Sequence, residues 1–433
     1  MKLRSLRFAL FSLNLKFLRQ YFSIKIIIKA FVGAFLLANV IFFSLIDNIF
    51  LNFISPFLTL TGIFIIINST RASFFVAGFF TGALWFYWIS FSFIYYDLPY
   101  LVPLVFLVIA LIYGMLFLFA SFPSFVPLRG VMLFLISYVH PFGFNWFNLE
   151  ATLVLGVFDP SVRGLAFIFL AAICLSLKYK FKFIAAVICL ICALQFKSTE
   201  AKMLPFDVQL INTNIAQSSR WEHELKDKFI DENLNLITGA ISLNRRAIIM
   251  PESAFPAFID HEPNLMAELK TLSKHIVIIA GGLGYENNQS YNSAYLFDNG
   301  KMRRLDKMIL VPFGEEIPLP KFLSGWINRV FFSGASDFKT AKAPSDYVID
   351  GIKIRNAICY EATRDEIYAG EFDVIIAITN NGWFVPSTQP VLQKILLKYF
   401  ATKYGKTIYH SVNGSPSGII VPKKAWIKLD SLL

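Results

Sequence analysis

The chain has 433 residues, of which 56% are hydrophobic and 16% aromatic, while only 16% are charged. Soluble domains usually carry about a quarter charged residues, so this composition disfavours an ordinary cytosolic enzyme and rules out disordered and collagen-like chains. Most of the net charge of +11 lies in the first 200 residues, which hold 14 basic and 5 acidic side chains against 26 and 24 in the rest. This distribution indicates membrane flanks and not a nucleic-acid-binding face.

Long stretches without a charged side chain divide the first half of the chain into candidate membrane spans. A bilayer span needs about 20 apolar residues without an unpaired charge. Five intervals meet this need, and they are bounded in turn by Lys29, Asp47, Arg71, Asp97, Arg129 and Glu150. Two shorter apolar runs, Ser161–Leu177 and Phe183–Phe196, complete a prediction of seven spans, with Arg163 reaching the membrane edge by its long side chain.

The positions of the basic residues predict how the spans are oriented, because Lys and Arg are retained on the cytoplasmic side of a membrane. The N-terminal segment is basic, and so are the connections after spans two, four and six; the residues are Lys2, Arg4, Arg7, Lys16, Arg19, Lys25, Arg71, Arg129, Lys178, Lys180 and Lys182. The other connections are acidic or neutral apart from Arg163. We therefore expect a cytoplasmic N-terminus and a second half outside the cytoplasm. A cleaved signal peptide ahead of a soluble protein does not fit, since apolar spans continue to residue 196.

From residue 201 the composition becomes that of a globular α/β domain, so we expect a transmembrane domain over 1–200 and a second domain over 201–433. Short β-branched runs predict strands at Phe206–Asn212, Ala247–Met250, His275–Ala280, Ser293–Asp298, Lys353–Cys359, Val374–Ile378 and Ser417–Val421. Polar stretches of helical character predict helices at Glu222–Ile237, Pro263–Ser273, Tyr360–Ala369 and Val391–Tyr404. This alternation favours a layered domain of sheets and helices.

Cys359 is the only cysteine of the second domain, because Cys174, Cys189 and Cys192 fall in predicted spans. Structural cysteines outside the cytoplasm normally come in pairs, so an unpaired thiol there suggests a function. Cys359 lies where a predicted strand gives way to a predicted helix, and amides at a helix start stabilise a thiolate or an oxyanion. These residues alone leave two interpretations open, a nucleophile and a buried core cysteine.

A cysteine nucleophile needs a base and a group that stabilises the developing oxyanion. Glu252 follows an apolar run, where its neighbours can raise its pKa toward that of a general base. A helix cap is the simpler interpretation of a lone Glu in this position, and a solvated flank is the simpler interpretation of Lys307. Histidine is the usual base, and the domain contains His223, His261, His275 and His410.

Three short motifs occur in this domain, namely Pro-Glu-Ser-Ala at 251–254, Lys-Met-Ile-Leu-Val-Pro-Phe-Gly-Glu at 307–315 and Ile-Cys-Tyr-Glu at 358–361. Their order and spacing resemble the Glu-Lys-Cys triad of the nitrilase superfamily. Together with the polytopic first half, they make nearly the whole chain resemble the apolipoprotein N-acyltransferases of the Gram-negative inner membrane. The resemblance implies an αββα sandwich that faces the periplasm and is attached to about seven membrane helices.

The resemblance also implies a mechanism without cofactor or metal. Glu252 would deprotonate Cys359, the thiolate would attack an ester carbonyl of a phospholipid, and Lys307 would stabilise the oxyanion. The α-amine of the lipidated N-terminal cysteine of an apolipoprotein would then attack the thioester and form an amide. We expect the bilayer, a phospholipid donor and a diacylated apolipoprotein as partners, no nucleic acid, and a monomer.

Five further positions match supporting residues of the family. Glu315, Tyr360 and Glu361 would surround the triad, where a second carboxylate orients the Lys. Trp221 matches a tryptophan near the site entrance, and Trp383 matches an aromatic residue after the strand that follows the nucleophile. Core packing is an equally good interpretation of both tryptophans.

The aromatic segments 82–88 and 141–146 of the first half resemble the same family, although Trp and Tyr favour membrane interfaces in any membrane protein. The family usually returns to the membrane through a final span. We expect no such span after Trp426, a departure that concerns the anchoring of the domain and leaves the triad intact.

Two other functions compete with acyl transfer. A membrane-tethered amidase or nitrilase acting on small molecules would use the same three residues, with water resolving the acyl-enzyme, but it needs no seven-span platform. A transporter with a soluble appendage would place charged residues inside its spans, and the five long intervals contain no Asp, Glu, Lys or Arg.

The predicted orientation determines where a topology reporter should be active. Alkaline phosphatase fused after Lys202 should be active, because this point lies beyond seven spans, and a fusion after Lys182 should be inactive. Phosphatase activity of cells, normalised to the amount of fusion protein, measures the difference. An active fusion after Lys182 would show that the span count is wrong.

Overall fold

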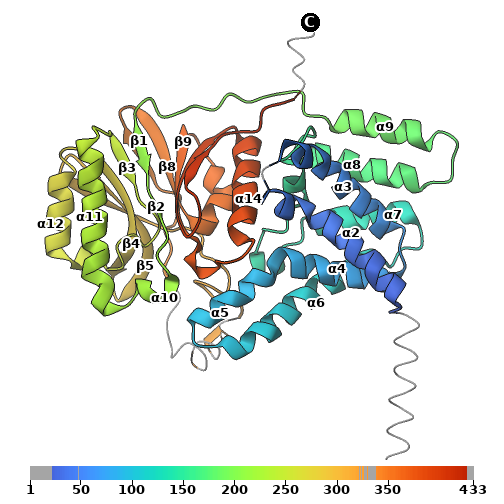
Figure 1. Ribbon diagram of the computed structural model, residues 1–433, viewed down its shortest axis with the longest axis horizontal. Coiled ribbons are helices and arrows are strands. Elements are labelled where there is room, and N and C mark those ends of the chain that lie inside the picture. The colour runs from blue at the N-terminus through green and yellow to red at the C-terminus, as the bar shows by residue number, and fades with distance from the viewer. Residues whose placement is uncertain are drawn as a thin grey trace, which may run out of the picture.

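The computed structural model describes residues 22–46, 48–320, 322, 324–325, 329 and 338–426, and it consists of two halves that pack side by side (Figure 1). We call residues 22–196 the helical half and residues 204–426 the α/β half. The expected basic residues Lys2, Arg4, Arg7, Lys16 and Arg19, and the acidic Asp47, lie outside the described residues.

The helical half is a bundle of apolar helices joined by short connections. Its main helices are α2 (Ile24–Phe43), α3 (Ile49–Ile67), α4 (Arg71–Phe86), α5 (Ser92–Tyr95), α6 (Val102–Ala120), α7 (Val126–Ile136), α8 (Val162–Ser176) and α9 (Lys182–Ala193). Among the described residues, four apolar helical stretches are long enough to cross a membrane, namely Ile24–Phe43, Ile49–Ile67, Arg71–Tyr95 and Pro99–Ala120, whereas α7, α8 and α9 are shorter. The predicted total of seven spans therefore stays a prediction.

The fifth predicted span differs most from the structure. Arg129 lies inside α7 and not in the connection before it, and α7 ends at Ile136. The segment that follows turns at Pro141 and Gly143, and its backbone groups bond to the α/β half. A helix is not required there, because these bonds satisfy the backbone polar groups that a helix would otherwise pair.

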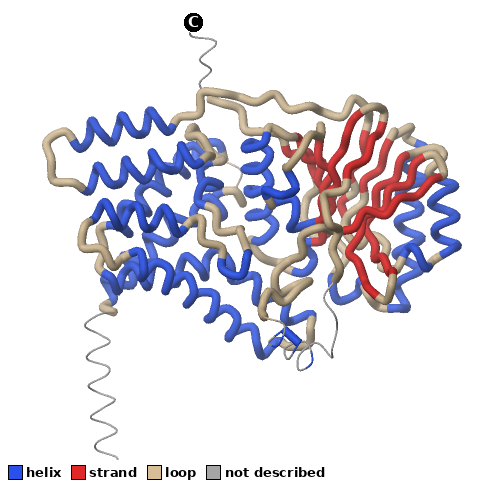
Figure 2. Tube along the Cα trace, turned by 180° about the vertical axis from the view of Figure 1, so that it is seen from behind, coloured by secondary structure: helices blue, strands red, loops and turns tan. Residues whose placement is uncertain are grey.

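The bundle has one end rich in basic residues and one end that meets the α/β half. At the basic end, side chains hold the carbonyl groups of neighbouring connections; the bonds are Lys29 Nζ to Asn68 O at 3.2 Å, Arg71 Nη2 to Phe122 O at 3.1 Å and Arg129 Nη1 to Ser69 O at 3.1 Å. Asn68 Nδ2 also donates to Ser176 Oγ at 2.6 Å, which places the α8–α9 connection at the same end. This end lies away from the sheets (Figures 1 and 2).

The α/β half contains two sheets. The first has the order β1-β3-β4-β5-β6, with β1 (Val208–Leu210), β3 (Ala247–Ile249), β4 (Val277–Glu286), β5 (Gln289–Asp298) and β6 (Lys301–Asp306). The second has the order β11-β10-β9-β8-β7, with β7 (Asp346–Ile349), β8 (Ile352–Ile358), β9 (Val374–Asn380), β10 (Thr407–Asn413) and β11 (Gly418–Ile420), and the short β2 (Asn212–Thr213) pairs with β10. In the first sheet β1, β3 and β4 run parallel, and in the second β8, β9 and β10 run parallel.

Alternating side chains along the strands build two sheet faces and so four layers. On β3, Ala247 and Ile249 join the core between the sheets, while Ile248 faces α11 (Lys226–Ser242) and α12 (Pro263–Leu272). On β9, Ile376 joins the inner core, while Ile375 faces α14 (Gln389–Tyr404). Because successive strand residues point to opposite faces, the result is an αββα sandwich with α14 on the side of the helical half (Figure 1).

All seven predicted strands are present, with shifted ends, and β6, β7 and β10 are additional. The predicted strand Phe206–Asn212 is divided, because β1 belongs to the first sheet and β2 to the second. The predicted helix Tyr360–Ala369 is wrong. Two short 3-10 helices, Cys359–Thr363 and Asp365–Tyr368, stand there and are separated by Arg364 in an extended conformation.

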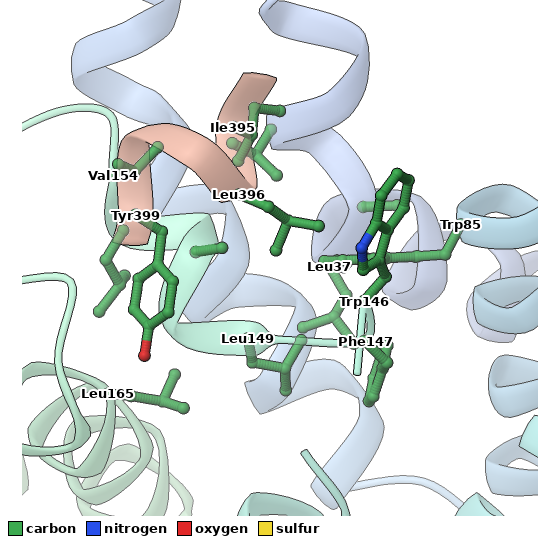
Figure 3. Close-up of a cluster of buried hydrophobic side chains, with 14 of the residues drawn as sticks. Leu37, Trp85, Trp146, Phe147, Leu149, Val154, Leu165, Ile395, Leu396 and Tyr399 are labelled. Atoms are coloured by element: carbon green, nitrogen blue, oxygen red, sulfur yellow. The ribbon is translucent and has the colours of Figure 1, made fainter. Parts of the chain in front are cut away.

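The two halves share one hydrophobic core, and α14 forms its centre. Figure 3 shows Ile395, Leu396 and Tyr399 of α14 among side chains of the helical half; the labelled partners are Leu37, Trp85, Trp146, Phe147, Leu149, Val154 and Leu165. Leu396 is 1% exposed. The α/β half is therefore packed against the bundle by a buried core and not tethered by a linker.

Two buried ionisable groups add polar contacts to this interface. Glu150 accepts hydrogen bonds from the hydroxyls of Tyr138, at 2.8 Å, and of Tyr399. Lys423 Nζ donates to Leu153 O at 2.8 Å and to Phe158 O. Buried polar groups of this kind are tolerated only when they are hydrogen-bonded.

The shared core predicts that an α14 substitution destabilises the whole protein. Leu396→Ala should lower the free energy of unfolding by about 2–5 kcal/mol, because it opens a cavity in a packed core. The apparent melting temperature of the detergent-solubilised protein measures this loss. Leu236→Ala on α11 is the matched control, since Leu236 is 37% exposed; an equal loss in both variants would contradict a continuous core.

Candidate active site

The candidate residues gather at the edge of the sandwich where strands of both sheets end. Glu252 follows β3, Lys307 directly follows β6, Cys359 directly follows β8, and Asn380 is the last residue of β9. Since β8 and β9 are parallel, their carboxyl ends meet at one edge, and the facing sheet brings the ends of β3 and β6 to the same place. Polar side chains at the carboxyl ends of strands commonly form binding sites in α/β folds.

Lys307 is the centre of the cluster, with a side chain that has no exposed surface. Its Nζ lies 2.7 Å from Glu315 Oε2 and 3.9 Å from Glu252 Oε1. Burial alone would lower the pKa of Lys307, but the carboxylates of Glu315 and Glu252 raise it above its ordinary value. The ammonium group therefore stays charged.

Glu252 is held by two donors from different sheets. Asn292 Nδ2 donates to Glu252 Oε1 at 2.8 Å, and the Asn380 N–H donates to Glu252 Oε2 at 2.7 Å. Burial raises the pKa of Glu252, and the negative charge of Glu315 raises it further, although Lys307 opposes the shift. A carboxylate with a raised pKa is a better general base than an ordinary surface Glu.

Glu315 is joined to Glu252 through Asn292, which donates to both carboxylates. Asn292 Nδ2 also donates to Glu315 Oε1 at 2.6 Å, and the Val311 N–H donates to Glu315 Oε2 at 2.9 Å. Glu315 therefore closes the segment after Lys307 into a loop and fixes the ammonium at the same time. Its role as a supporting residue of the reaction stays a prediction.

Cys359 is partly exposed and sits on a sharp turn, with a backbone φ of 56°. This left-handed conformation is uncommon for a residue other than Gly and is found mainly at functional sites. Burial raises the pKa of the Cys359 thiol well above its ordinary value, and the charge of Glu252 adds to this, whereas Lys307 and the Asn380 N–H act in the opposite direction. The thiol is therefore protonated at rest and needs a base.

Glu361 supports the turn from within. Its Oε1 accepts the Ile358 N–H at 2.7 Å, and its Oε2 accepts the N–H groups of Met308 and Ile309 at 2.8 and 3.1 Å. One carboxylate thus ties the chain next to Cys359 to the chain next to Lys307. Burial raises the pKa of Glu361 to about 7 despite these donors.

Tyr360 contacts the helical half and not the carboxylates. Its ring stacks on Phe144, with 5.4 Å between the centroids and 11° between the planes, and its hydroxyl donates to Gly143 O at 3.2 Å. Trp146 Nε1 donates to Thr363 Oγ1 at 2.8 Å. The 3-10 helix that begins with Cys359 therefore packs against the aromatic segment 141–146.

The two tryptophans have different surroundings. The Trp383 ring contacts the rings of Tyr95 and Tyr96 with centroid separations of 5.9 and 5.6 Å, so it joins the end of α5 to the site edge. Trp221 is 45% exposed at the end of α10 (Gln217–Arg220). An exposed position is compatible with an entrance, and its role stays a prediction.

Three polar residues of the site were not among the predicted ones: Asn292, Asn380 and Arg220. Arg220 is 1% exposed, its Nη1 donates to Ser253 O, and burial lowers its pKa to about 10 while the charge of Glu252 opposes the shift. Single Asn and Arg residues in strands and short helices leave no periodic pattern in the sequence. Of the three, only Arg220 could have been indicated, because it precedes Trp221. Gly281 is also part of the site, since a Cβ there would lie 2.6 Å from the Glu252 Cα.

Of the four histidines considered as a base, His410 has a hydrogen-bond partner of its own. His410 is buried in β10 with Nε2 2.8 Å from Thr379 Oγ1, and burial lowers its pKa to about 3. The groups whose charges act on the Cys359 thiol are Glu252, Lys307 and Glu315. Within the described ranges, no group of three His, Cys, Asp or Glu side chains is arranged to hold a metal ion.

A thiol, a buried carboxylate and a buried ammonium in this arrangement suit covalent acyl transfer. Solved structures with a similar shape include a CN-hydrolase superfamily protein from Xanthomonas campestris, with a TM-score of 0.38 and 15% identity over 49% of this chain and 77% of that one. An amidase from Nesterenkonia sp. has a TM-score of 0.35 and 14% identity, and covers 49% of this chain and 77% of its own.

Comparison of the sequence with known proteins indicates the family more specifically than comparison of the structure does. The family model described as the apolipoprotein N-acyltransferase integral membrane domain matches residues 24–196. Apolipoprotein N-acyltransferase of Wolinella succinogenes is 41% identical over 81% of this chain and 86% of its own length. The protein of the same name from Campylobacter jejuni is 40% identical over 92% of this chain and 90% of its own length. The chain therefore belongs to the apolipoprotein N-acyltransferase family.

Proposed function

We propose that the protein transfers an acyl chain from a phospholipid to the α-amine of the N-terminal diacylglyceryl-cysteine of apolipoproteins, through a thioester on Cys359. The observation that carries the proposal is that Cys359, Glu252 and Lys307 meet at one edge of the sandwich: Glu361 ties the backbone next to Cys359 to that next to Lys307, and Lys307 lies between two carboxylates, one of them Glu252. The names of the relatives supply the acyl acceptor, and the membrane-domain match supports a lipid donor.

In the first step Glu252 takes the proton of the Cys359 thiol, and the sulfur attacks the ester carbonyl carbon. A C–S bond forms, and the carbonyl oxygen becomes an oxyanion that the Lys307 ammonium stabilises. When the intermediate collapses, the ester C–O bond breaks. Glu252 returns the proton to the leaving oxygen, and lysophospholipid departs.

In the second step the α-amine attacks the thioester carbonyl. Glu252 accepts a proton from the amine, the C–N bond forms, and the C–S bond breaks with Cys359 leaving. The Cys359 sulfur regains its proton from Glu252, so the enzyme returns to its starting state. Lys307 keeps its proton throughout, because Glu315 and Glu252 hold its pKa high.

The helical half supports this function by providing a lipid-facing surface next to the site. The exposed side chains of α6 are apolar along its length; they include Leu104, Leu107, Val108, Leu111, Met115 and Phe119. The chain just before α6 carries Tyr95 and Tyr96, which pack on Trp383 at the site edge. We further propose a membrane domain over 1–200 with seven spans, a catalytic domain over 201–433 in the periplasm, attachment to the inner membrane, and a monomer.

A membrane-tethered amidase is the remaining alternative, since it would use the same three residues. The two functions differ in what resolves the acyl-enzyme, an amine or water. An amidase would turn over in the absence of an acceptor and would accumulate little thioester. The thioester is therefore the decisive observable.

We expect purified wild-type protein mixed with phospholipid alone to gain the mass of one acyl chain. Hydroxylamine should remove this mass, since it cleaves thioesters. Cys359→Ala should gain none, and Cys359→Ser should fold but gain almost none, because a hydroxyl has no comparable anionic form near neutral pH. Intact-protein mass spectrometry measures the adduct. Acyl transfer by Cys359→Ala at the wild-type rate would overturn the mechanism.

Glu252→Gln should slow formation of the thioester itself, and not only its resolution. The glutamine amide has one acceptor oxygen, so it can keep the bond from only one of the donors Asn292 and Asn380. It cannot accept the thiol proton, so the rate should fall by roughly 10²–10⁴-fold. The rate of adduct formation with phospholipid and no acceptor measures this step. Normal accumulation would mean that another carboxylate, Glu315 or Glu361, activates the thiol.

In the same assay, Lys307→Met should cost about 2.7–4 kcal/mol of transition-state stabilisation. Lys307→Arg should not restore the rate, because a planar guanidinium does not replace a compact ammonium. Since Lys307→Met also leaves Glu315 without its partner, the double variant Lys307→Met/Glu315→Gln is the control. The double variant should recover the melting temperature of the wild-type protein but not its rate of adduct formation. Recovery of both quantities would mean that Lys307 has only a structural role.

A further inference from the structure

A cavity at the end of the bundle opposite the α/β half has no part in the chemistry described above. It has a volume of about 460 Å³ and lies between the starts of α2, α4 and α7 and the end of α3; the lining residues are Lys25, Ile26, Lys29, Asn68, Ser69, Thr70, Ser73 and Arg129. The cavity is thus walled by three cations, four residues with polar side chains and a single apolar side chain.

Within the described residues, no acidic side chain pairs with the cations that line this cavity. Lys25, Lys29 and Arg129 form no ion pair with any residue in the described part of the chain, and Lys29 and Arg129 instead donate to the carbonyls of Asn68 and Ser69. The 21 residues that precede the described part contain no Asp or Glu. An anion from outside the chain is therefore the natural counter-charge.

A second and independent feature also suits an anion. The Ser73 side chain lines the cavity and is 3% exposed, and its hydroxyl has no hydrogen-bond partner among the described residues. Ser73 stands in the first turn of α4, a helix of 16 residues whose N-terminal cap is Thr70. Backbone N–H groups at a helix start and a free hydroxyl are the donors that bind phosphate.

The surroundings distinguish a lipid headgroup from a free phosphate. Ile24 and Ile28, which alternate with Lys25 and Lys29 at the start of α2, are 76% and 57% exposed. Apolar side chains in the open next to cations suit acyl chains that lie beside a charged headgroup. Basic pockets between membrane helices bind anionic headgroups in other proteins.

We propose that this cavity binds the phosphate headgroup of an anionic phospholipid in the leaflet opposite the α/β half. Lys25, Lys29 and Arg129 would supply the charge, and Ser73 would donate a hydrogen bond to a phosphate oxygen. The site is separate from Cys359 and does not depend on the proposed acyl transfer. It would fix the bundle at a set depth in the membrane.

The test uses the full chain with Cys359→Ala, so that no acyl transfer disturbs the measurement. Native mass spectrometry in a non-ionic detergent compares bound phosphatidylglycerol with phosphatidylcholine of the same acyl chains. We expect phosphatidylglycerol to bind more tightly. Lys25→Gln/Lys29→Gln should weaken its binding by roughly five-fold for each Lys, the effect of one cation near a headgroup.

Lys178→Gln/Lys180→Gln is the matched control, because it removes the same charge from the same end of the bundle but outside the cavity. An equal loss of binding in this control would show a diffuse surface attraction and overturn the proposal. Inorganic phosphate in large excess should not displace the lipid, and full displacement would assign the site to free phosphate.

Ser73→Ala keeps the test independent of folding. Because the hydroxyl has no partner in the described structure, the variant should keep its melting temperature while phosphatidylglycerol binding falls several-fold. Unchanged binding in Ser73→Ala together with unchanged binding in the lysine pair would overturn the proposal.

Discussion

The buried ammonium of Lys307 is the constraint on which the rest of the site depends. A charge without exposed surface is tolerated only when an opposite charge pairs with it. Here the carboxylates of Glu315 and Glu252 lie 2.7 and 3.9 Å from Lys307 Nζ, and Asn292 donates to both of them. These groups come from β3, β5, β6 and the loop after β6, and the Asn380 N–H adds the second sheet. The bonds of the charged cluster are therefore complete only when the two sheets pack against each other.

The helical half takes part in positioning the proposed nucleophile. The 3-10 helix that begins at Cys359 is anchored on one side by Glu361, which binds backbone groups of the α/β half, and on the other by Phe144 and Trp146 of the helical half. A residue with φ of 56° keeps this conformation only where its surroundings hold it. The position of the thiol is thus set by both halves, which also share the hydrophobic core around α14 (Figure 3).

Local patterns predict much of this structure, and the failures have physical reasons. Buried β-branched runs reveal β3, β4, β8 and β9, and the motifs at 251–254, 307–315 and 358–361 lie where the site forms. β10 escapes prediction because polar residues interrupt its apolar pattern, and they are tolerated since Ser411 Oγ donates to the carbonyls of Ile211 and Ile249. β6 escapes prediction because its sequence is rich in charged residues. These charges are tolerated in a strand since Arg304 pairs with Asp260 and Glu286. The helix expected after Cys359 fails because Glu361 binds backbone groups outside its own segment, which no local pattern reveals.

The arrangement of charge along the bundle connects the site to the membrane. Cationic side chains collect at one end, where Lys29, Arg71 and Arg129 bind carbonyl groups of the connections, and the charge cluster of the α/β half lies beyond the other end. The exposed surface of α6 between them is apolar. A molecule that approaches along this surface stays in an apolar environment until it reaches Tyr95 and Tyr96, which contact Trp383 at the site edge. In the proposed mechanism, the low-dielectric surroundings that shield a lipid chain would also strengthen the attraction between Lys307 and a developing oxyanion. A site at the end of an apolar helix would then serve binding and chemistry together.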